Sequence, residues 1–310
     1  MIKIDLITGF LGSGKTTLLR RYARFLIDSG LRVGILENDY GAVNVDVMLL
    51  SELESERCVI EAVAGACCAD CHRRRFKTKL IALAMSGCDR VLVEPSGIFD
   101  VDEFFDSLRE PPLDEWYEVG SVIAVADAEP GEELSPASRY LLASQAADAG
   151  LLILSKTENV SGNAADEAVG RVNSALRELG CERQFGGDDV IKKPWSELGA
   201  KDFERLRDCG RRFEGFVKLL PQEQGFSTLY FMNTGLSPEE LRLRTEALFG
   251  DPSCGRIFRV KGFTRGADGW YELNAAKNSL SLLPIERGQD VLIAIGEGLC
   301  EDRIREILLK

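Results

Sequence analysis

The residues with the clearest chemical role lie near the start of the chain, in the segment Gly9-Phe10-Leu11-Gly12-Ser13-Gly14-Lys15-Thr16-Thr17. This segment matches G-x-x-x-x-G-K-[S/T], a loop whose backbone N–H groups surround phosphate oxygens. Lys15 is expected to reach the β- and γ-phosphates, and the Thr16 hydroxyl to ligate Mg²⁺. The remaining predicted nucleotide contacts in the loop are Gly12, Ser13, Gly14 and Thr17. The alternative is an ordinary glycine-rich turn, but the complete match predicts a nucleoside triphosphate site.

Two further polar segments follow apolar runs that have the character of strands. Residues 32–36 lead into Glu37-Asn38-Asp39-Tyr40-Gly41, and residues 89–93 lead into Glu94-Pro95-Ser96-Gly97. In a doubly wound sheet, the loops at the carboxyl ends of the strands surround the ligand. We therefore expect Asp39 and Glu94 to lie beside Mg²⁺ together with Thr16, and Gly97 to present an N–H group to the γ-phosphate.

The catalytic assignment rests on the same residues. Lys15 and the loop amides would stabilise the charge on the transferring phosphoryl group, with Asp39 and Glu94 on the Mg²⁺ side. The sequence leaves open which residue orients the attacking water, because Glu37, Asp39 and Asp46 are all candidates. The first segment also allows another interpretation, in which Asn38 and Gly41 only supply tolerant backbone for a turn.

A cluster of thiols follows in the segment 65–72. Cys67, Cys68 and Cys71 lie within five residues, and three thiolates can converge on one soft or borderline metal ion, with His72 or an outside group as a fourth ligand. The basic run at 73–79 would favour thiolates. Buried structural cysteines, a redox pair and a solvated basic helix face are the alternatives, and His72 itself could be exposed. The isolated cysteines are interpreted as small hydrophobes: Cys58, Cys88, Cys181, Cys209, Cys254 and Cys300.

The predicted strand at 150–154 ends in Ser155-Lys156-Thr157-Glu158, where a GTPase carries N-K-x-D. In that pattern the carboxylate accepts two N–H bonds from guanine, the lysine lies along the base and the asparagine braces the loop. Lys156 and Glu158 are accordingly the predicted base contacts. Ser155 lacks the amide, so the choice between GTP and ATP stays open at this point. The loop 192–195 is expected to lie near the base.

Composition limits the classes of partner. The net charge of −12 argues against nucleic acid, because binding a phosphate backbone needs a basic surface. No apolar run of about 18 residues is present, which argues against a membrane span. With no export signal before the first strand, we expect a cytoplasmic protein whose nine cysteines stay reduced.

Length and pattern predict two domains in the 310 residues. Strands and helices alternate over residues 1–215, which predicts an α/β P-loop NTPase domain with a mostly parallel sheet and helices on both faces. Residues 216–310 change character. A strand at 228–231 precedes a helix that begins with the cap Ser237-Pro238, and short strands at 256–260, 269–273, 280–283 and 290–295 precede a final helix at 300–309. This order, close to βαβββα, predicts a small α+β domain.

Taken together, these residues resemble the CobW-like branch of the P-loop GTPases, whose relatives include the nickel-delivery GTPases of urease and hydrogenase. The matching blocks, in the expected order, are GFLGSGKTTLL, ENDYG, the cysteine cluster, EPSG, QAADAGLLILSKTE and, in the second domain, RVKGF. Three features depart from the family: C-C-x-x-C replaces C-x-C-C, with Gly65 at the first cysteine position; S-K-T-E replaces the base motif; and there is no histidine-rich tract.

The resemblance implies a metallochaperone or metallocofactor-assembly factor of low intrinsic hydrolysis rate. Its cofactors would be GTP or GDP, Mg²⁺ and a transition metal (Zn, Co, Ni or Fe). Its partner would be a client metalloprotein or a cofactor-assembly protein, and a homodimer dependent on nucleotide or metal is a further expectation. Two rivals stay open: a non-catalytic sensor or scaffold, and a small-molecule kinase, which would give the thiols no role.

Overall fold

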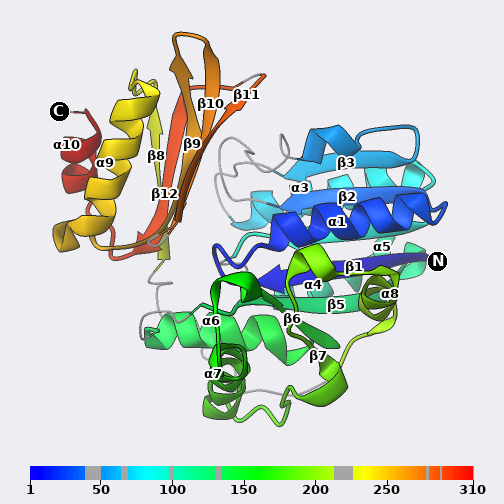
Figure 1. The fold of residues 1–310 in the computed structure, drawn as a ribbon. Helices are drawn as coiled ribbons and strands as arrows, with labels where there is room; N and C mark the ends of the chain where they lie inside the picture. The colour runs from blue at the N-terminus through cyan, green and yellow to red at the C-terminus, as the bar shows by residue number, and fades with distance from the viewer. Residues whose placement is uncertain are drawn as a thin grey trace. The chain divides into compact units, whose positions relative to one another are not determined.

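The computed structural model describes residues 1–38, 50–63, 69–97, 101–129, 134–212, 226–276, 279–286 and 288–309. These residues form two compact units, one that ends its described part at Arg212 and one that begins at Phe226 (Figure 1). The domain boundary predicted at 215/216 falls outside the described residues. Each unit is described by itself below.

The described part of the first unit is built on a seven-stranded sheet whose strands all pair in parallel. The spatial order β3-β2-β4-β1-β5-β6-β7 places the first strand in the centre. The strands are β1 (Ile2–Gly9), β2 (Val33–Asn38), β3 (Cys58–Val63), β4 (Arg90–Pro95), β5 (Tyr117–Asp127), β6 (Leu151–Ser155) and β7 (Val190–Ile191). The predicted parallel α/β fold is confirmed. The edge strand β3 was not predicted, and four of its six residues are only half-buried.

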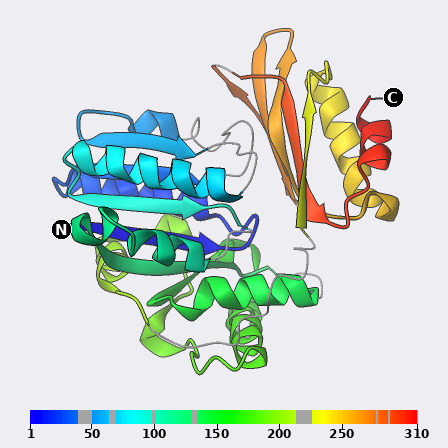
Figure 2. The same cartoon turned by 180° about the vertical axis from the view of Figure 1, so that it is seen from behind.

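Helices cover both faces of this sheet (Figures 1 and 2). They are α1 (Lys15–Asp28), α3 (Ala69–Met85), α4 (Val101–Leu108), α5 (Leu113–Trp116), α6 (Pro136–Ala147), α7 (Ala164–Glu178) and α8 (Ala200–Asp208). Successive side chains of a strand point to opposite faces. Leu6 accordingly joins the core beneath α3, α4, α6 and α7, whereas Ile7 joins the core beneath α1 and α8. None of the helices in the described ranges is long and apolar enough to cross a membrane.

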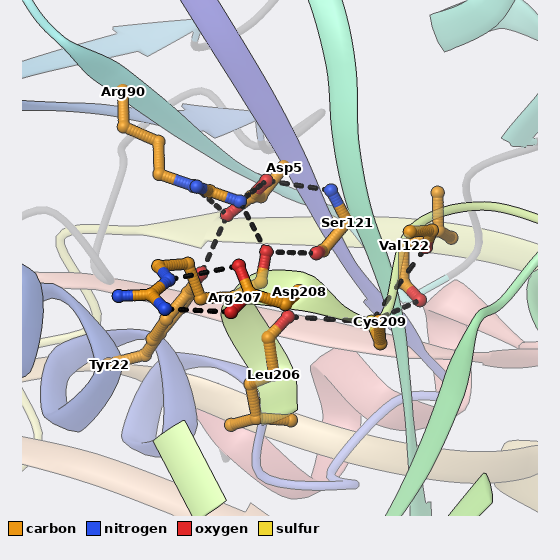
Figure 3. A network of polar contacts seen from close by, with 10 residues as sticks. Asp5, Tyr22, Arg90, Ser121, Val122, Leu206, Arg207, Asp208 and Cys209 are labelled. Atoms are coloured by element: carbon orange, nitrogen blue, oxygen red, sulfur yellow. Dashed lines mark hydrogen bonds and ion pairs between the residues drawn. The ribbon is translucent and has the colours of Figure 1, made fainter. Parts of the chain in front are cut away.

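A buried ion pair lies at the centre of the sheet (Figure 3). The Asp5 carboxylate, fully buried on β1, accepts two bonds from the Arg90 guanidinium of β4, at 2.6 and 2.8 Å. It also accepts from the Tyr22 hydroxyl of α1 and from the Ser121 N–H of β5, each at 2.8 Å. Arg90 and the Ser121 hydroxyl both donate to the Arg207 carbonyl of α8, at 2.7 Å. The carboxylate thereby connects β1 to β4, β5 and α1, and Arg90 and Ser121 extend the network to α8.

Burial dominates the acid–base properties of this network. It raises the pKa of Asp5, against the opposing effect of Arg90, and it raises the pKa of Tyr22 together with the Asp5 charge. The Arg90 pKa would be lowered by burial, but the bond to Asp5 raises it on balance. Removing one member of such a pair leaves the other buried without its counter-charge, which is the costly event.

The described part of the second unit is a five-stranded antiparallel sheet of order β11-β10-β9-β12-β8. Its strands are β8 (Phe226–Met232), β9 (Arg256–Gly266), β10 (Gly269–Ala276), β11 (Ser279–Ile285) and β12 (Val291–Glu297). The helices α9 (Pro238–Gly250) and α10 (Glu301–Leu309) pack on one face (Figure 1). Ser237 caps α9 through a capping box with Glu240, as expected for that helix start. The α+β class is confirmed, and all four short strands expected between the helices are present, so the order is βαββββα.

We expect Asp5→Ala to lower the free energy of unfolding of the first unit by about 3–5 kcal/mol, because Arg90 would stay buried without its partner. Lys3→Ala is the matched control, since Lys3 also reaches from β1 to β5, in a 2.7 Å pair with Glu118 whose side chains are 45% and 53% exposed. It should cost less than about 1 kcal/mol. Urea unfolding measures both values, and equal effects would contradict the assignment.

Candidate functional site

The phosphate loop joins the end of β1 to the start of α1. Lys15 opens the helix with its side chain only 5% exposed, and its ammonium donates to the Gly9 carbonyl at 3.0 Å and to the Phe10 carbonyl at 3.5 Å. The ammonium therefore lies over the carbonyls of its own loop. A buried cation in that position can exchange those carbonyls for phosphate oxygens with little movement of the backbone.

The loop is tied to β4 by a side-chain hydrogen bond. Thr16 donates its hydroxyl to Glu94 Oε1 at 2.8 Å, and Glu94 is 4% exposed. Glu37 of β2 lies in register with Glu94 and is also buried, at 2% exposure. Two carboxylates and a hydroxyl at one sheet edge provide the hard oxygen ligands that Mg²⁺ prefers. Asp39, the other predicted Mg²⁺ ligand, lies outside the described residues.

Buried polar groups at the same edge fit a polar ligand. In the described ranges, the hydroxyls of Thr8 and Ser13 and both amide atoms of Asn38 are buried without a hydrogen-bond partner. Such groups are rarely left unsatisfied in a native protein. They lie at the end of β1, in the phosphate loop and at the end of β2, which is where the motif places the nucleotide. The donor set therefore suits a phosphate group with its cation.

Gly97 lies against the phosphate loop. A Cβ atom built on Gly97 would come within 2.6 Å of the Leu11 nitrogen, so no other residue fits without moving one of the two segments. Gln145 of α6 donates to the Gly97 carbonyl at 2.8 Å and fixes this segment. The sequence predicted Gly97 but not Gln145, because a polar residue within a helix gives no signal of the carbonyl that it will meet.

The predicted base loop leaves β6 beside the end of β5. Lys156, in the left-handed region with φ 55°, donates to Asp127 and, at 3.4 Å, to Glu129. Burial would lower the Lys156 pKa, but the bonds and charges of Asp127 and Glu129 raise it on balance. Glu158, in the turn Thr157–Asn159, is exposed. Asp127 and Glu129 were not predicted, since neither matches a motif.

The cysteine segment is described only in part. Cys67 and Cys68 lie outside the described residues, and Cys71 is half-buried in the first turn of α3. Within the described ranges, no three His, Cys, Asp or Glu residues are grouped to hold a metal ion. His72 is 1% exposed, so the alternative that it is simply exposed was wrong. Arg73 and Lys77 both pair with Glu110, which engages two cations of the predicted basic face.

Burial favours the protonated form of four of the other thiols. Burial raises the pKa of Cys58 and of Cys209 to about 11, and it also raises the pKa values of Cys88 and Cys254. These groups stay protonated near neutral pH, whereas the thiolate is the ligating species. Their interpretation as small hydrophobes fits the buried ones. Cys300 is exposed, so the interpretation was wrong for that residue.

Comparison with known proteins decides the family. Residues 3–185 match the model described as CobW/HypB/UreG, nucleotide-binding domain. The chain belongs to the CobW/HypB/UreG family of P-loop GTPases. This confirms the family resemblance and the P-loop NTPase class.

Two curated relatives of this family are zinc chaperones of Escherichia coli (strain K12). YeiR is 27% identical over 306 residues, which is 96% of this chain and 85% of that protein. YjiA is 29% identical over 186 residues, 56% of this chain and 55% of that protein. The crystal structure of Zn(II)-bound YjiA GTPase from E. coli covers 100% of this chain and 99% of that one at 18% identity, with a TM-score of 0.35. A TM-score that low carries no structural inference.

We expect Thr16→Ala to weaken Mg²⁺-dependent GTP binding by about 10- to 100-fold. The variant loses the hydrogen bond to Glu94, and it also loses the hydroxyl that is the predicted Mg²⁺ ligand. Isothermal titration with and without Mg²⁺ measures the effect. Ser29→Ala, which removes a hydroxyl at the other end of α1, is the control and should bind as the parent does. A Thr16→Ala protein that matches the parent in Mg²⁺ would contradict the assignment.

Proposed function

We propose that this chain hydrolyses GTP and delivers a divalent transition metal, bound at its cysteine cluster, to a client protein. The observation that supports this most is the 2.8 Å bond from Thr16 to Glu94, which joins the phosphate loop to the end of β4. In the sheet, β2 lies between β4 and β3, the strand that the cysteine segment follows in the sequence. In this member of the CobW/HypB/UreG family, the proposal is that a nucleotide contact at Glu94 is transmitted across the ends of β2 and β3 to the proposed metal ligands.

Lys15, Thr16 and Glu94 would hold the nucleotide and its Mg²⁺, with Asp39 as a further proposed ligand. Mg²⁺, when bound, supplies charge neutralisation on the phosphate oxygens. Lys15 would leave the Gly9 carbonyl and donate to the β- and γ-phosphates, while the loop amides of residues 12–17 bind the remaining oxygens. Gly97, held by Gln145, would donate its N–H to the γ-phosphate.

Hydrolysis then needs an oriented water. Among the three proposed candidates, Glu37 lies beside Glu94 in the described part of the chain, whereas Asp39 and Asp46 fall outside it. Positioning and charge stabilisation carry most of the catalysis in phosphoryl transfer. A low intrinsic rate, with activation completed by the client, is part of this proposal.

The base loop supports GTP as the nucleotide. Glu158 is exposed at the sheet edge and keeps the carboxylate that accepts guanine N–H groups. Lys156 is anchored by Asp127 and Glu129, and the proposal is that its side chain lies along the base when the nucleotide binds. Both residues are proposed contacts of guanine.

Strand register supports a link between the nucleotide and the metal. Val63 at the end of β3 is in register with Asn38 on β2, which is in register with Pro95, the residue after Glu94. The chain that carries Cys67 and Cys68 therefore starts from the same sheet edge as the proposed Mg²⁺ ligands. We propose Cys67, Cys68 and Cys71 as ligands of the cargo metal, and zinc as that metal, since the relatives YeiR and YjiA are named zinc chaperones.

A Lys15→Ala variant tests the nucleotide half of the proposal. We expect the parent to show multiple-turnover release of phosphate from GTP, and the variant to lose at least about 100-fold in rate, because the developing charge loses its cation. Lys3→Ala, at an exposed position of β1, is the control. Tight GTP binding without turnover, even with a client present, would support the sensor alternative instead.

The triple variant Cys67→Ser, Cys68→Ser, Cys71→Ser tests the metal half. We expect the parent to bind about one Zn²⁺ per chain and the triple variant to lose that ion, because a hydroxyl does not replace a thiolate on a borderline metal. Cys300→Ser, at the exposed thiol of the second unit, should bind zinc as the parent does. Competition with a chromophoric chelator measures all three, and unchanged affinity in the triple variant would contradict the site.

A further inference from the structure

Trp195 lies at the edge of the first sheet where the nucleotide is proposed to bind. It begins the turn Trp195–Glu197, a few residues after β7, and is 8% exposed. Because Ile191 of β7 is in register with Ile153 of β6, the segments that follow these two strands leave the sheet at the same edge. A large aromatic side chain therefore lies beside the start of the predicted base loop.

The indole touches the phosphate loop. Gly14 caps α1 in the left-handed region with φ 94°, and a Cβ atom built on it would meet Trp195 Cη2 at 2.8 Å and Cζ3 at 3.3 Å. Any side chain at position 14 would thus be strained and would collide with the indole. The six-membered ring packs directly against the backbone from which the loop presents its N–H groups.

The same indole is bonded to the base loop. Trp195 Nε1 donates to the Leu154 carbonyl at 2.8 Å, in a buried bond just before Ser155. Ser155 is 2% exposed, and its Cβ lies 3.5 Å from the Cβ position built on Gly14. Gly14, Ser155 and Trp195 thus meet at one point. The Ser155 hydroxyl faces the Ala126 carbonyl at 3.4 Å, so a residue longer than serine at position 155 would have to displace one of these close neighbours.

The backbone of this segment is fixed on two helices. Arg21 of α1 donates to the Trp195 carbonyl at 2.6 Å. Lys193 forms a 2.6 Å ion pair with Asp202, which also accepts from the Gly199 N–H at the start of α8. Contacts with α1 and α8 consequently fix the backbone around Trp195, while the indole contacts the phosphate loop and the base loop.

We propose that Trp195 is a positioning residue for the nucleotide. It holds the phosphate loop at a fixed distance from the base loop and takes the place of the asparagine amide that Ser155 lacks. This inference rests on the proposed GTP binding. The two loops bind opposite ends of one ligand, so their separation determines how well the phosphates and guanine are engaged together. In this proposal, the small side chain at position 155 leaves room for the large indole at position 195.

The test measures GTP and ATP affinities in full-length protein carrying Trp116→Phe and Trp270→Phe, so that Trp195 is the only tryptophan. In this reference protein, we expect Trp195 emission to change when GTP binds. Trp195→Ala should lower GTP affinity at least about tenfold and reduce the preference for GTP over ATP, with Trp195→Phe between the two. Ser155→Asn should also weaken GTP binding, because its amide collides with the indole.

The double variant Ser155→Asn, Trp195→Ala tests whether the Trp195 indole takes the place of the asparagine amide that Ser155 lacks. It should bind GTP more tightly than Trp195→Ala alone, since the amide then has room to brace the loop. The inference is overturned if Trp195→Ala keeps the GTP affinity and the GTP-to-ATP ratio within about twofold of the reference. If Trp195→Ala does not fold by circular dichroism, unchanged Trp195 emission and unchanged binding by Ser155→Asn overturn it. A reference protein that binds no GTP overturns the proposed function itself, and this inference with it.

Discussion

A single buried carboxylate holds the strands that form the site in place. Asp5 is fully buried on the central strand β1 and takes donors from β4, β5 and α1. Both β1, which leads into the phosphate loop, and β4, which ends in Glu94, depend on this contact for their relative position. The cost of burying a charge is acceptable only where the partners surround it completely, and such networks fix a unique arrangement of the elements around them.

The parallel pairing of the strands also places the proposed functional residues at one edge of the sheet, where the strands have their carboxyl ends. The ends of β1, β2, β3 and β4 lie side by side, so Gly9, Asn38, Val63 and Glu94 share one edge of one sheet. Loss of the γ-phosphate on hydrolysis would first change the contacts of Thr16 and Glu94. Backbone hydrogen bonds connect β4 to β2 and β2 to β3, the strand after which the cysteine segment follows in the sequence. This arrangement suits a switch in which γ-phosphate contacts order a loop that also carries metal ligands.

Much of the fold could be predicted because its signals are local. The complete phosphate-loop pattern located β1 and α1, and the Ser237-Pro238 cap located α9. The sequence pattern does not predict strand β3, because it is an edge strand that contains the charged Glu61 and has four half-buried residues. The four short strands expected between the helices of the second unit are all present, but each runs past its expected end, because the boundaries of short strands carry weak patterns.

The site could be predicted less completely, because its supporting contacts are tertiary. Lys15, Thr16, Glu94 and Gly97 follow from the motif and its strand context, and the structure brings them together. Gln145, Asp127 and the contact of Trp195 with Gly14 depend on segments far apart in the chain. The burial of His72 and the exposure of Cys300 likewise depend on packing that spacing does not encode. The roles of Asp39, Cys67 and Cys68 stay predictions.

The most direct test of the central claim is the affinity of the full-length protein for Zn²⁺ with GDP bound and with a non-hydrolysable GTP analogue bound. If the nucleotide and the thiols share one switch, the two zinc affinities should differ by at least about fivefold, and zinc should change the preference for the analogue over GDP by the same factor. Equal zinc affinities in the two nucleotide states would contradict the account.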